Sequence, residues 1–141
     1  MNILFVDKYN RFRSKIAEAF FNRNNKNKKN KAKSAGVVEG NAIAPEVFDG
    51  AKDCNIEIKG NPKGLDTNIL QWQDMIVIVA NDIPVAFFKD NNVQGKPVIV
   101  WNIEDTKTNN REEMKRIMLK IEEQVDAFIK TLADKTNTYK Q

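Results

Sequence analysis

Residues 1–21 read Met1-Asn2-Ile3-Leu4-Phe5-Val6-Asp7-Lys8-Tyr9-Asn10-Arg11-Phe12-Arg13-Ser14-Lys15-Ile16-Ala17-Glu18-Ala19-Phe20-Phe21, and this stretch decides the fold. Four consecutive apolar residues, 3–6, are typical of a strand covered on both faces, as in the middle of a parallel sheet. A short polar loop follows, and then a helix with an apolar face. A strand that enters a helix in this way leaves backbone N–H groups free at the helix start, which favours an anion there.

Two charged residues frame this loop. Arg13 stands at the helix entrance, where its forked donors suit two oxygens of a phosphate-like group. Asp7 stands where the loop leaves the strand. A negative residue in a loop built for anions is unexpected, and it becomes the central question of this sequence.

The rest of the chain alternates strands and helices. Further strands are expected at 31–36, 75–80 and 97–101, and the weakly apolar 31–36 is predicted at a sheet edge. Helices are expected near 44–54, 65–71, 84–89 and 110–134. This order predicts one α/β domain over residues 1–134, a doubly wound, four-stranded parallel sheet with helices on both faces, and a polar tail at 135–141. Ligands of such folds bind beyond the carboxyl ends of the strands, so the opening loop, Asn81 and residues 102–105 should face one crevice.

Composition indicates an ordinary globular protein. At 141 residues the chain fits one domain, and no apolar run approaches the roughly 20 residues of a transmembrane helix. The start lacks the pattern of a secretory signal, and the single cysteine, Cys54, cannot form an internal disulfide, so we expect a cytoplasmic protein. Cys54 follows Val47 and Ala51 at helical spacing, which predicts a small buried apolar role rather than a reactive thiol.

Charge is unevenly distributed. The net charge is +4, and much of the excess lies in the Asn/Lys-rich run 23–33. Such a run can bind nucleic acid, but no aromatic residues interleave it, so we interpret it as a solvated loop and expect no nucleic-acid partner. The chain has no histidine, which removes a histidine base and imidazole-ligated metal sites. We expect no cofactor, no bound metal and no membrane partner, and a monomer or weak dimer.

Residues 3–20 resemble the low-molecular-weight protein tyrosine phosphatases and their relatives, the thioredoxin-linked arsenate reductases. The loop of that family runs Cys, five residues, Arg, then Ser or Thr, with Asn three residues after the Cys and Met/Ile-Ala-Glu-Ala in the following helix. Further matches occur in the same order along the chain, at Ser34-Ala35-Gly36, Asp74 and Trp101-Asn102-Ile103-Glu104-Asp105.

The resemblance implies a role for each matching residue. In the family the cysteine attacks phosphorus, while the loop amides and the arginine stabilise the oxygens. Arg13 would then be the oxyanion clamp, Asp105 the general acid, and Asp7 stands at the nucleophile position. Asn10 would shape the loop, and Ser14 would place a hydroxyl beneath the nucleophile. The implied ligand is phosphate or another oxyanion, including a phosphotyrosine-containing protein, and the implied anion-binding residues are Lys8, Tyr9, Asn10, Arg11, Phe12, Arg13 and Ser14.

The sequence departs from this pattern in several places. Asp7 replaces the cysteine, and Thr106 replaces the proline of the family's Asp-Pro. Tyr9 stands where glycine is usual and must avoid a positive φ or be strained. Phe12 replaces a frequent second cysteine, and the tyrosines that often flank a phosphotyrosine ring are absent. Arsenate reduction needs several thiols, which Cys54 alone cannot supply.

An aspartate at this position has predictable physical effects. Its carboxylate should accept hydrogen bonds inside the loop, in the place of an external anion. Arg13 and the loop N–H groups should then lower the pKa of Asp7. The bound carboxylate would repel a phosphate dianion at a cost on the order of several kcal/mol in a dry site. The first hypothesis is therefore a phosphatase-like protein whose cysteine-based hydrolysis is lost or altered.

Four alternatives remain open. Asp7 could be a nucleophile that forms an aspartyl-phosphate, a chemistry that usually requires Mg²⁺, with Asp105 and Asp82 as the available companion carboxylates. The chain could be an engineered form of an active phosphatase in which Asp7 substitutes for the natural cysteine. Asp7 could simply cap the loop in a protein of unrelated function. Finally, the protein could be a non-catalytic scaffold that binds a partner through the crevice or the basic loop.

Overall fold

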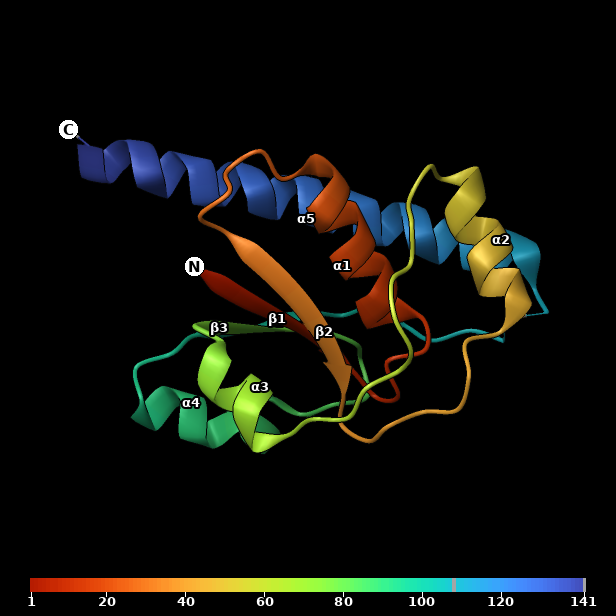
Figure 1. The fold of residues 1–141 in the computed structure, drawn as a ribbon, viewed down its shortest axis with the longest axis horizontal. Helices are drawn as coiled ribbons and strands as arrows, with labels where there is room; N and C mark the ends of the chain where they lie inside the picture. The colour runs from red at the N-terminus through yellow and green to blue at the C-terminus, as the bar shows by residue number, and fades with distance from the viewer. Residues whose placement is uncertain (108, 141) are drawn as a thin grey trace.

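The computed structural model describes residues 1–107 and 109–140, with side chains described as far as residue 134 (Figure 1). The elements in chain order are β1 (Asn2–Asp7), α1 (Arg13–Asn24), β2 (Lys31–Gly36), α2 (Pro45–Asp53), α3 (Thr67–Trp72), β3 (Met75–Val79), the 3₁₀ helix η1 (Val85–Phe88), α4 (Lys89–Val93), β4 (Val98–Trp101) and α5 (Arg111–Lys140). The predicted alternation of strands and helices is confirmed, with boundaries that differ from prediction by a few residues.

The four strands form one parallel sheet in the order β2-β1-β3-β4. Phe5 of β1 lies opposite Ser34 of β2 on one side and Val77 of β3 on the other. β2 lies at the sheet edge, as predicted, and β1 is central. The carboxyl ends of β1 and β3 are therefore neighbours, which brings the loops that follow these two strands together.

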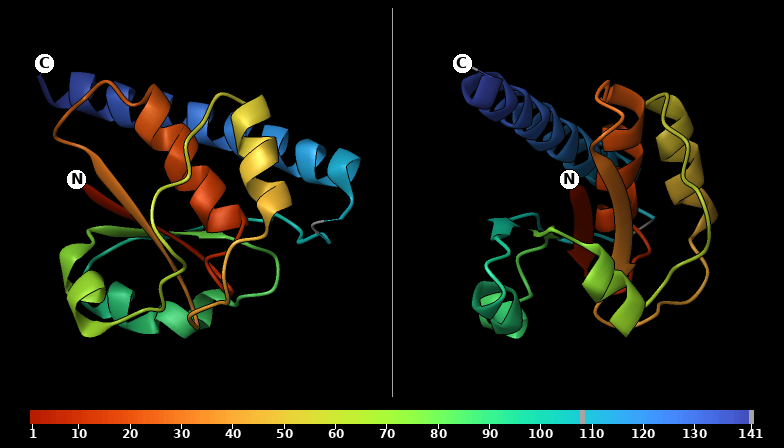
Figure 2. Two further views of the ribbon diagram at one scale, coloured as in Figure 1. Left: turned by 45° about the vertical axis from the view of Figure 1, so that its right-hand side comes forward. Right: turned by 60° about the vertical axis from the view of Figure 1, so that its left-hand side comes forward.

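Helices cover both faces of the sheet (Figure 2). Ile3 and Phe5 pack with α1, α2 and α5, whereas Leu4 and Val6 face the smaller cluster of α3 and η1. All four side chains are fully buried, because alternate residues of a strand point to opposite faces and both faces are covered here. This arrangement explains the continuous apolar run at the start of the chain.

The apolar face of the predicted C-terminal helix is buried in the structure. The apolar residues that recur at three- and four-residue steps along α5 are all buried, namely Met114, Ile117, Ile121, Val125, Phe128 and Leu132. The backbone of α5 continues to Lys140. The predicted tail 135–141 falls on residues that lie outside the fully described part, so the boundary after residue 134 stays a prediction. In the part of the chain that the structure describes, no helix is both long and apolar enough to cross a membrane.

Cys54 differs from its prediction. It follows the last turn of α2 and is only partly buried, packing at the margin of the larger core cluster. Val47 and Ala51 at the preceding helical positions are fully buried or nearly so. The predicted spacing is therefore right for these two residues, but the helix ends before it can carry Cys54 inside.

Candidate oxyanion-binding site

Asp7 ends β1 and turns its carboxylate into the loop that joins β1 to α1. Oδ1 accepts the backbone N–H of Asn10 at 2.7 Å and the hydroxyl of Ser14 at 2.8 Å. Oδ2 accepts the backbone N–H of Ser14 at 3.0 Å. The residue is only 3% exposed. The loop thus binds both carboxylate oxygens of Asp7, as predicted from the sequence.

Asn10 fixes the shape of the loop. It has a φ of 56°, in the left-handed region that asparagine tolerates better than most residues, and it is fully buried. Its Nδ2 donates to the hydroxyls of Ser14 at 2.8 Å and Ser34 at 2.9 Å, and its Oδ1 accepts the N–H of Lys63 at 2.9 Å. The amide therefore ties the loop to α1, to β2 and to the segment before α3. Tyr9 keeps a negative φ and avoids the strain that a positive value would bring.

The segment after β2 lies directly against this loop. Val37 and Val38 donate their N–H groups to the carbonyls of Asp7 and Lys8. A Cβ on Gly36 would lie 2.6 Å from the carbonyl carbon of Tyr9 and 2.7 Å from the nitrogen of Asn10. Such distances are too short for any side chain, so Gly36 is required for this close approach.

Arg13 is the first residue of α1 and is 2% exposed. Its Nη1 donates to the carbonyl of Ile103 at 2.9 Å. Its Nη2 lies 3.4 Å from Oδ1 of Asp82 and 3.9 Å from Oδ2 of Asp105. Among the ion pairs of the described residues, Arg13 thus engages the carboxylates that follow β3 and β4, not Asp7. The crevice prediction is correct for Asp105, while Asp82 rather than Asn81 reaches the site from β3.

A small pocket opens above the Asp7 carboxylate. Its volume is about 80 Å³, and it is lined by Asp7, Tyr9, Arg11, Phe12, Arg13, Ala44, Asp105 and Thr106. This is far below the roughly 300–1,000 Å³ of sites for drug-sized ligands and suits a small anion or the tip of a side chain. Within the described part of the chain, the N–H groups of Tyr9, Arg11 and Phe12 meet no protein acceptor. They remain available to a ligand.

The predicted site residues divide into two layers around this pocket. Asp7, Tyr9, Arg11, Phe12, Arg13 and Asp105 line it. Asn10 and Ser14 lie beneath the Asp7 carboxylate, whereas Lys8 is exposed and places its amine 5.3 Å from the Tyr9 ring centre. Arg11 donates to the carbonyl of Ala42 at 3.2 Å, which makes its side chain a wall of the pocket. Within the described residues, no three Asp, Glu, His or Cys side chains form a group that could hold a metal ion.

The electrostatic prediction for Asp7 is wrong in sign. Burial raises the pKa of the carboxyl above its usual value, and this effect outweighs the hydrogen bonds from Ser14 and Asn10 and the charge of Arg13, which lower it. Desolvation wins because the group is almost completely enclosed, while Arg13 turns its donors toward other acceptors. Asp7 therefore holds its proton more strongly than an exposed aspartate.

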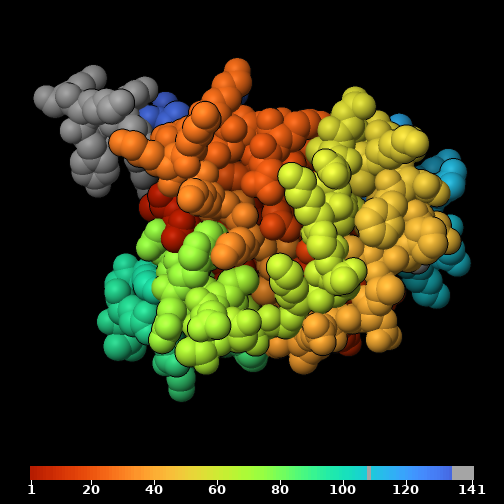
Figure 3. All heavy atoms as spheres, viewed as in Figure 1, coloured from red at the N-terminus to blue at the C-terminus, as the bar shows by residue number. Residues whose placement is uncertain are grey.

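A second carboxyl, partly buried, lies behind the loop. Glu18 accepts the hydroxyl of Ser34 at 2.7 Å, and Ser34 accepts from Asn10. Burial raises the pKa of Glu18 and lowers that of Lys15, whose Nζ donates to the carbonyl of Lys59 at 2.8 Å. The yellow-green segment after α2 crosses α1 here, and Figure 3 shows it on the surface between β2 and α2. This polar layer supports the loop from the side away from the pocket.

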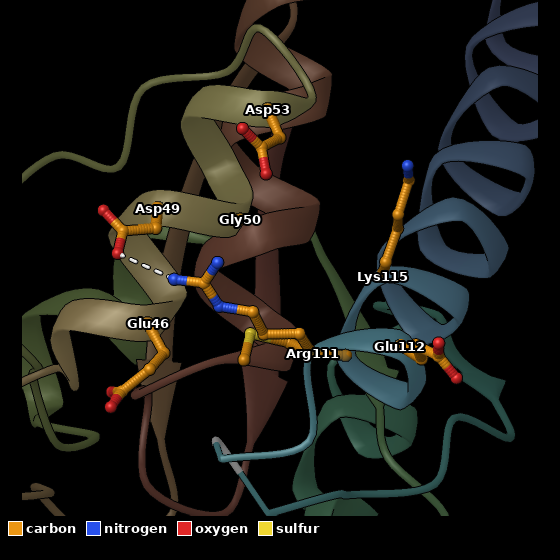
Figure 4. Close-up of a pocket in the computed structure, with 8 residues that line it drawn as sticks. Glu46, Asp49, Gly50, Asp53, Arg111, Glu112 and Lys115 are labelled. Carbon is orange, nitrogen blue, oxygen red and sulfur yellow. Dashed lines mark ion pairs between the residues drawn. The ribbon is translucent and has the colours of Figure 1, made fainter.

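A larger hollow of about 160 Å³ lies elsewhere, between α2 and α5 (Figure 4). Its rim carries charges of both signs, and Arg111 points across it to pair with Asp49 at 3.6 Å. It contains none of the predicted site residues. The residues predicted from the sequence line the smaller pocket above Asp7 instead.

Sequence reasoning missed the partners of Arg13 and Asn10. Asp82, the Ile103 carbonyl and the Lys63 N–H come from segments far along the chain. Asp82 carried one usable signal. It follows the carboxyl end of a strongly apolar strand, which is where ligands of such folds bind. The other two are backbone groups, which no residue type reveals.

Comparison with solved structures gives the same fold. The chain is similar to an arsenate reductase from Archaeoglobus fulgidus (27% identity, TM-score 0.70, 90% of this chain and 98% of that one). It is also similar to a low molecular weight protein tyrosine phosphatase from T. tengcongensis (25%, 0.76, 93% and 99%). YwlE arginine phosphatase from Geobacillus stearothermophilus superimposes with a TM-score of 0.82 at 19% identity, over 97% of this chain and 96% of that one. A comparison with curated proteins gave no match.

The sequence also matches one protein family along nearly its whole length. Residues 2–138 fit the pattern of the family described as low molecular weight phosphotyrosine protein phosphatase. The match spans the loop, the sheet and α5, and it agrees with the resemblance read from the opening residues. The chain belongs to the low molecular weight phosphotyrosine protein phosphatase family.

Proposed function

We propose that this protein keeps the oxyanion-binding loop of its family over residues 7–14 but has lost the family's cysteine-based hydrolysis of phosphomonoesters. One observation carries the proposal. The buried Asp7 carboxylate accepts hydrogen bonds from Asn10 N–H, Ser14 N–H and the Ser14 hydroxyl. In the proposed reading, the loop stabilises a carboxylate in the place where relatives carry a thiolate.

An ionised Asp7 would oppose the binding of a phosphate dianion. Two unit charges about 4 Å apart repel by on the order of 4 kcal/mol at the effective dielectric of a protein surface. The free N–H groups and Arg13 act against this repulsion. The protonated form of Asp7, favoured by its raised pKa, removes the repulsion altogether. The proposal is therefore a weak oxyanion site whose affinity depends on the proton of Asp7.

The ligand class follows from the pocket and from relatives. An arsenate reductase in its phosphate-binding state and Vibrio vulnificus Wzb with benzylphosphonate share this fold, with TM-scores of 0.77 and 0.73. We infer that phosphate or a similar oxyanion occupies the pocket, and that the oxyanion can belong to a phosphotyrosine-containing protein. Tyr9 is 41% exposed at the rim and would pack against an aryl group. The proposal places the protein in the cytoplasm as a monomer or weak dimer.

Arsenate reduction is not part of the proposal. Cys54 is the only cysteine of the chain and follows α2, outside the lining of the Asp7 pocket. Burial raises the pKa of its thiol, which reduces the thiolate fraction that redox chemistry requires. A relay of thiols cannot be assembled from this residue.

A phosphoryl group on Asp7 itself is the second candidate. A mutant of YwlE arginine phosphatase carries a phosphorylated serine in its active site, so an oxygen in this fold can take a phosphoryl group. Asp7 lines the pocket, which favours this chemistry. Two features oppose it: the hydrogen bonds already occupy both carboxylate oxygens, and the raised pKa lowers the fraction of Asp7 that is ionised and able to attack.

Hydrolysis of an aryl phosphate by the unchanged protein separates the two candidates. The proposal predicts no turnover above that of the Asp7→Asn variant, with or without Mg²⁺. Intact-mass spectrometry of the protein after incubation is expected to show no added phosphoryl group. Metal-dependent turnover, or a phosphoryl adduct lost in Asp7→Asn, would instead establish the aspartyl-phosphate route.

A further inference from the structure

The two terminal nitrogens of Arg13 have different partners. Nη1 donates to the Ile103 carbonyl at 2.9 Å, a short bond to a fixed backbone group. Nη2 faces Asp82, at 3.4 Å from Oδ1 and 3.5 Å from Oδ2, both at the long end of hydrogen-bond distances. Nη1 thus anchors the guanidinium, and Nη2 is the nitrogen that can change partners.

Asp82 reaches Arg13 from outside the pocket. Arg13 lines the pocket, while Asp82 does not. The Asp82 side chain is 39% exposed, and Arg13 is 2% exposed. Nη2 therefore lies between Asp82, which is outside the pocket, and Asp105, which lines it and whose Oδ2 is 3.9 Å away. A ligand oxygen in the pocket needs the same nitrogen.

We propose that Asp82 is an internal competitor for Arg13, a positioning residue that withholds Nη2 from an oxyanion in the Asp7 pocket. This inference rests on the proposed function, because it assumes that the pocket takes an oxyanion. It assigns the site two arrangements. In one, Nη2 pairs with Asp82, as in the structure, and in the other it binds the ligand while Asp82 is released to water.

The effect of this competition is modest and has a definite sign. The Asp82 carboxylate is partly exposed and its contacts with Nη2 are long, so removing its charge should strengthen oxyanion binding by about two- to fivefold. The opposite change in oxyanion affinity is expected if Asp82 only supports Arg13. If Asp82 held Arg13 in the orientation that a ligand needs, removing its charge would weaken binding.

Titration with inorganic phosphate tests the inference. Asp7→Asn serves as the background, because it removes the repelling charge on the pocket floor, and calorimetry gives its phosphate affinity. Asp7→Asn/Asp82→Asn is expected to bind phosphate about two- to fivefold more tightly than Asp7→Asn. Asp90→Asn in the same background is the matched control, since Asp90 is an exposed aspartate in the first turn of α4. It should leave the affinity unchanged.

A second readout needs no ligand. Side-chain nitrogen NMR signals of Arg13 are expected to shift in Asp82→Asn and to stay in place in Asp90→Asn. Equal or weaker phosphate binding in Asp7→Asn/Asp82→Asn than in Asp7→Asn would overturn the competition and leave the proposed function standing. Phosphate binding by neither variant would overturn both.

Discussion

Two hydrogen bonds join the Asp7 carboxylate to Ser14. Oδ1 accepts the Ser14 hydroxyl at 2.8 Å, and Oδ2 accepts the Ser14 N–H at 3.0 Å. This pair closes the loop between the end of β1 and the first turn of α1. A donor pair of this kind stabilises a negative group at the loop floor, whether that group is a thiolate or a carboxylate. In the proposed function, this donor pair holds a carboxylate where the family carries a thiolate.

The affinity for sulfate should depend on pH through Asp7. Sulfate keeps its charge across the working range, so any change reports the protein. The pKa of Asp7 is raised, and its protonated form does not repel an anion, so the affinity is expected to increase as pH falls through that pKa. Sulfate titrations at a series of pH values upward from about 4 measure this. The Asp7→Asn variant should lose most of the pH dependence, and an equal dependence in both proteins would count against a role for Asp7.

Asp7 should also affect folding stability in a pH-dependent way. A group whose folded pKa is raised binds more protons in the folded state than in the unfolded state. Its contribution is fully present below 3.8, the ordinary pKa of an aspartate, and is lost as pH rises through the folded pKa. The free energy of unfolding of the unchanged protein, relative to Asp7→Asn, should therefore decrease over this window by at most about 1.4 kcal/mol per pH unit. Urea denaturation at a series of pH values measures the difference, and a difference that increased with pH would contradict it.

Gly36→Ala should damage the loop specifically. The new Cβ would lie 2.5–2.7 Å from backbone atoms of Val38, Tyr9 and Asn10, none of which can move without displacing the loop. We expect a loss of about 1–3 kcal/mol in stability and weaker sulfate binding. Gly50→Ala is the control, because the atoms nearest its Cβ would be the flexible ends of Met118 and Met114, and alanine would favour the helix. Thermal unfolding of both variants tests this, and equal effects would remove the special role of Gly36.

Much of the fold follows from the sequence because three of its four strands, β1, β3 and β4, contain continuous apolar runs. Residues 3–6 and 75–79 are typical of strands covered on both faces, and both are fully buried or nearly so. The 3.6-residue spacing in α5 likewise specifies which side faces the core. Cys54 was placed wrongly because a helical spacing says nothing of where the helix ends.

The site was less predictable, and the reason is physical. The loop motif identified Asp7, Asn10 and Arg13, because it is contiguous in sequence. The contact between Arg13 and Asp82 depends on the neighbouring positions of β1 and β3, which only the sheet order reveals. The sign of the Asp7 pKa shift depends on the balance between burial and hydrogen bonding, and residue types alone do not give that balance.

The most direct test of the central claim is the turnover of an aryl phosphate by Asp7→Cys, with Asp7→Ser as the control of similar size. If Asp7 is what stops the family's chemistry, the thiol variant should gain hydrolysis at least about a hundredfold above the unchanged protein, through a covalent phosphocysteine. Asp7→Ser should show no turnover. An Asp7→Cys protein that folds and binds sulfate but hydrolyses nothing would contradict the claim.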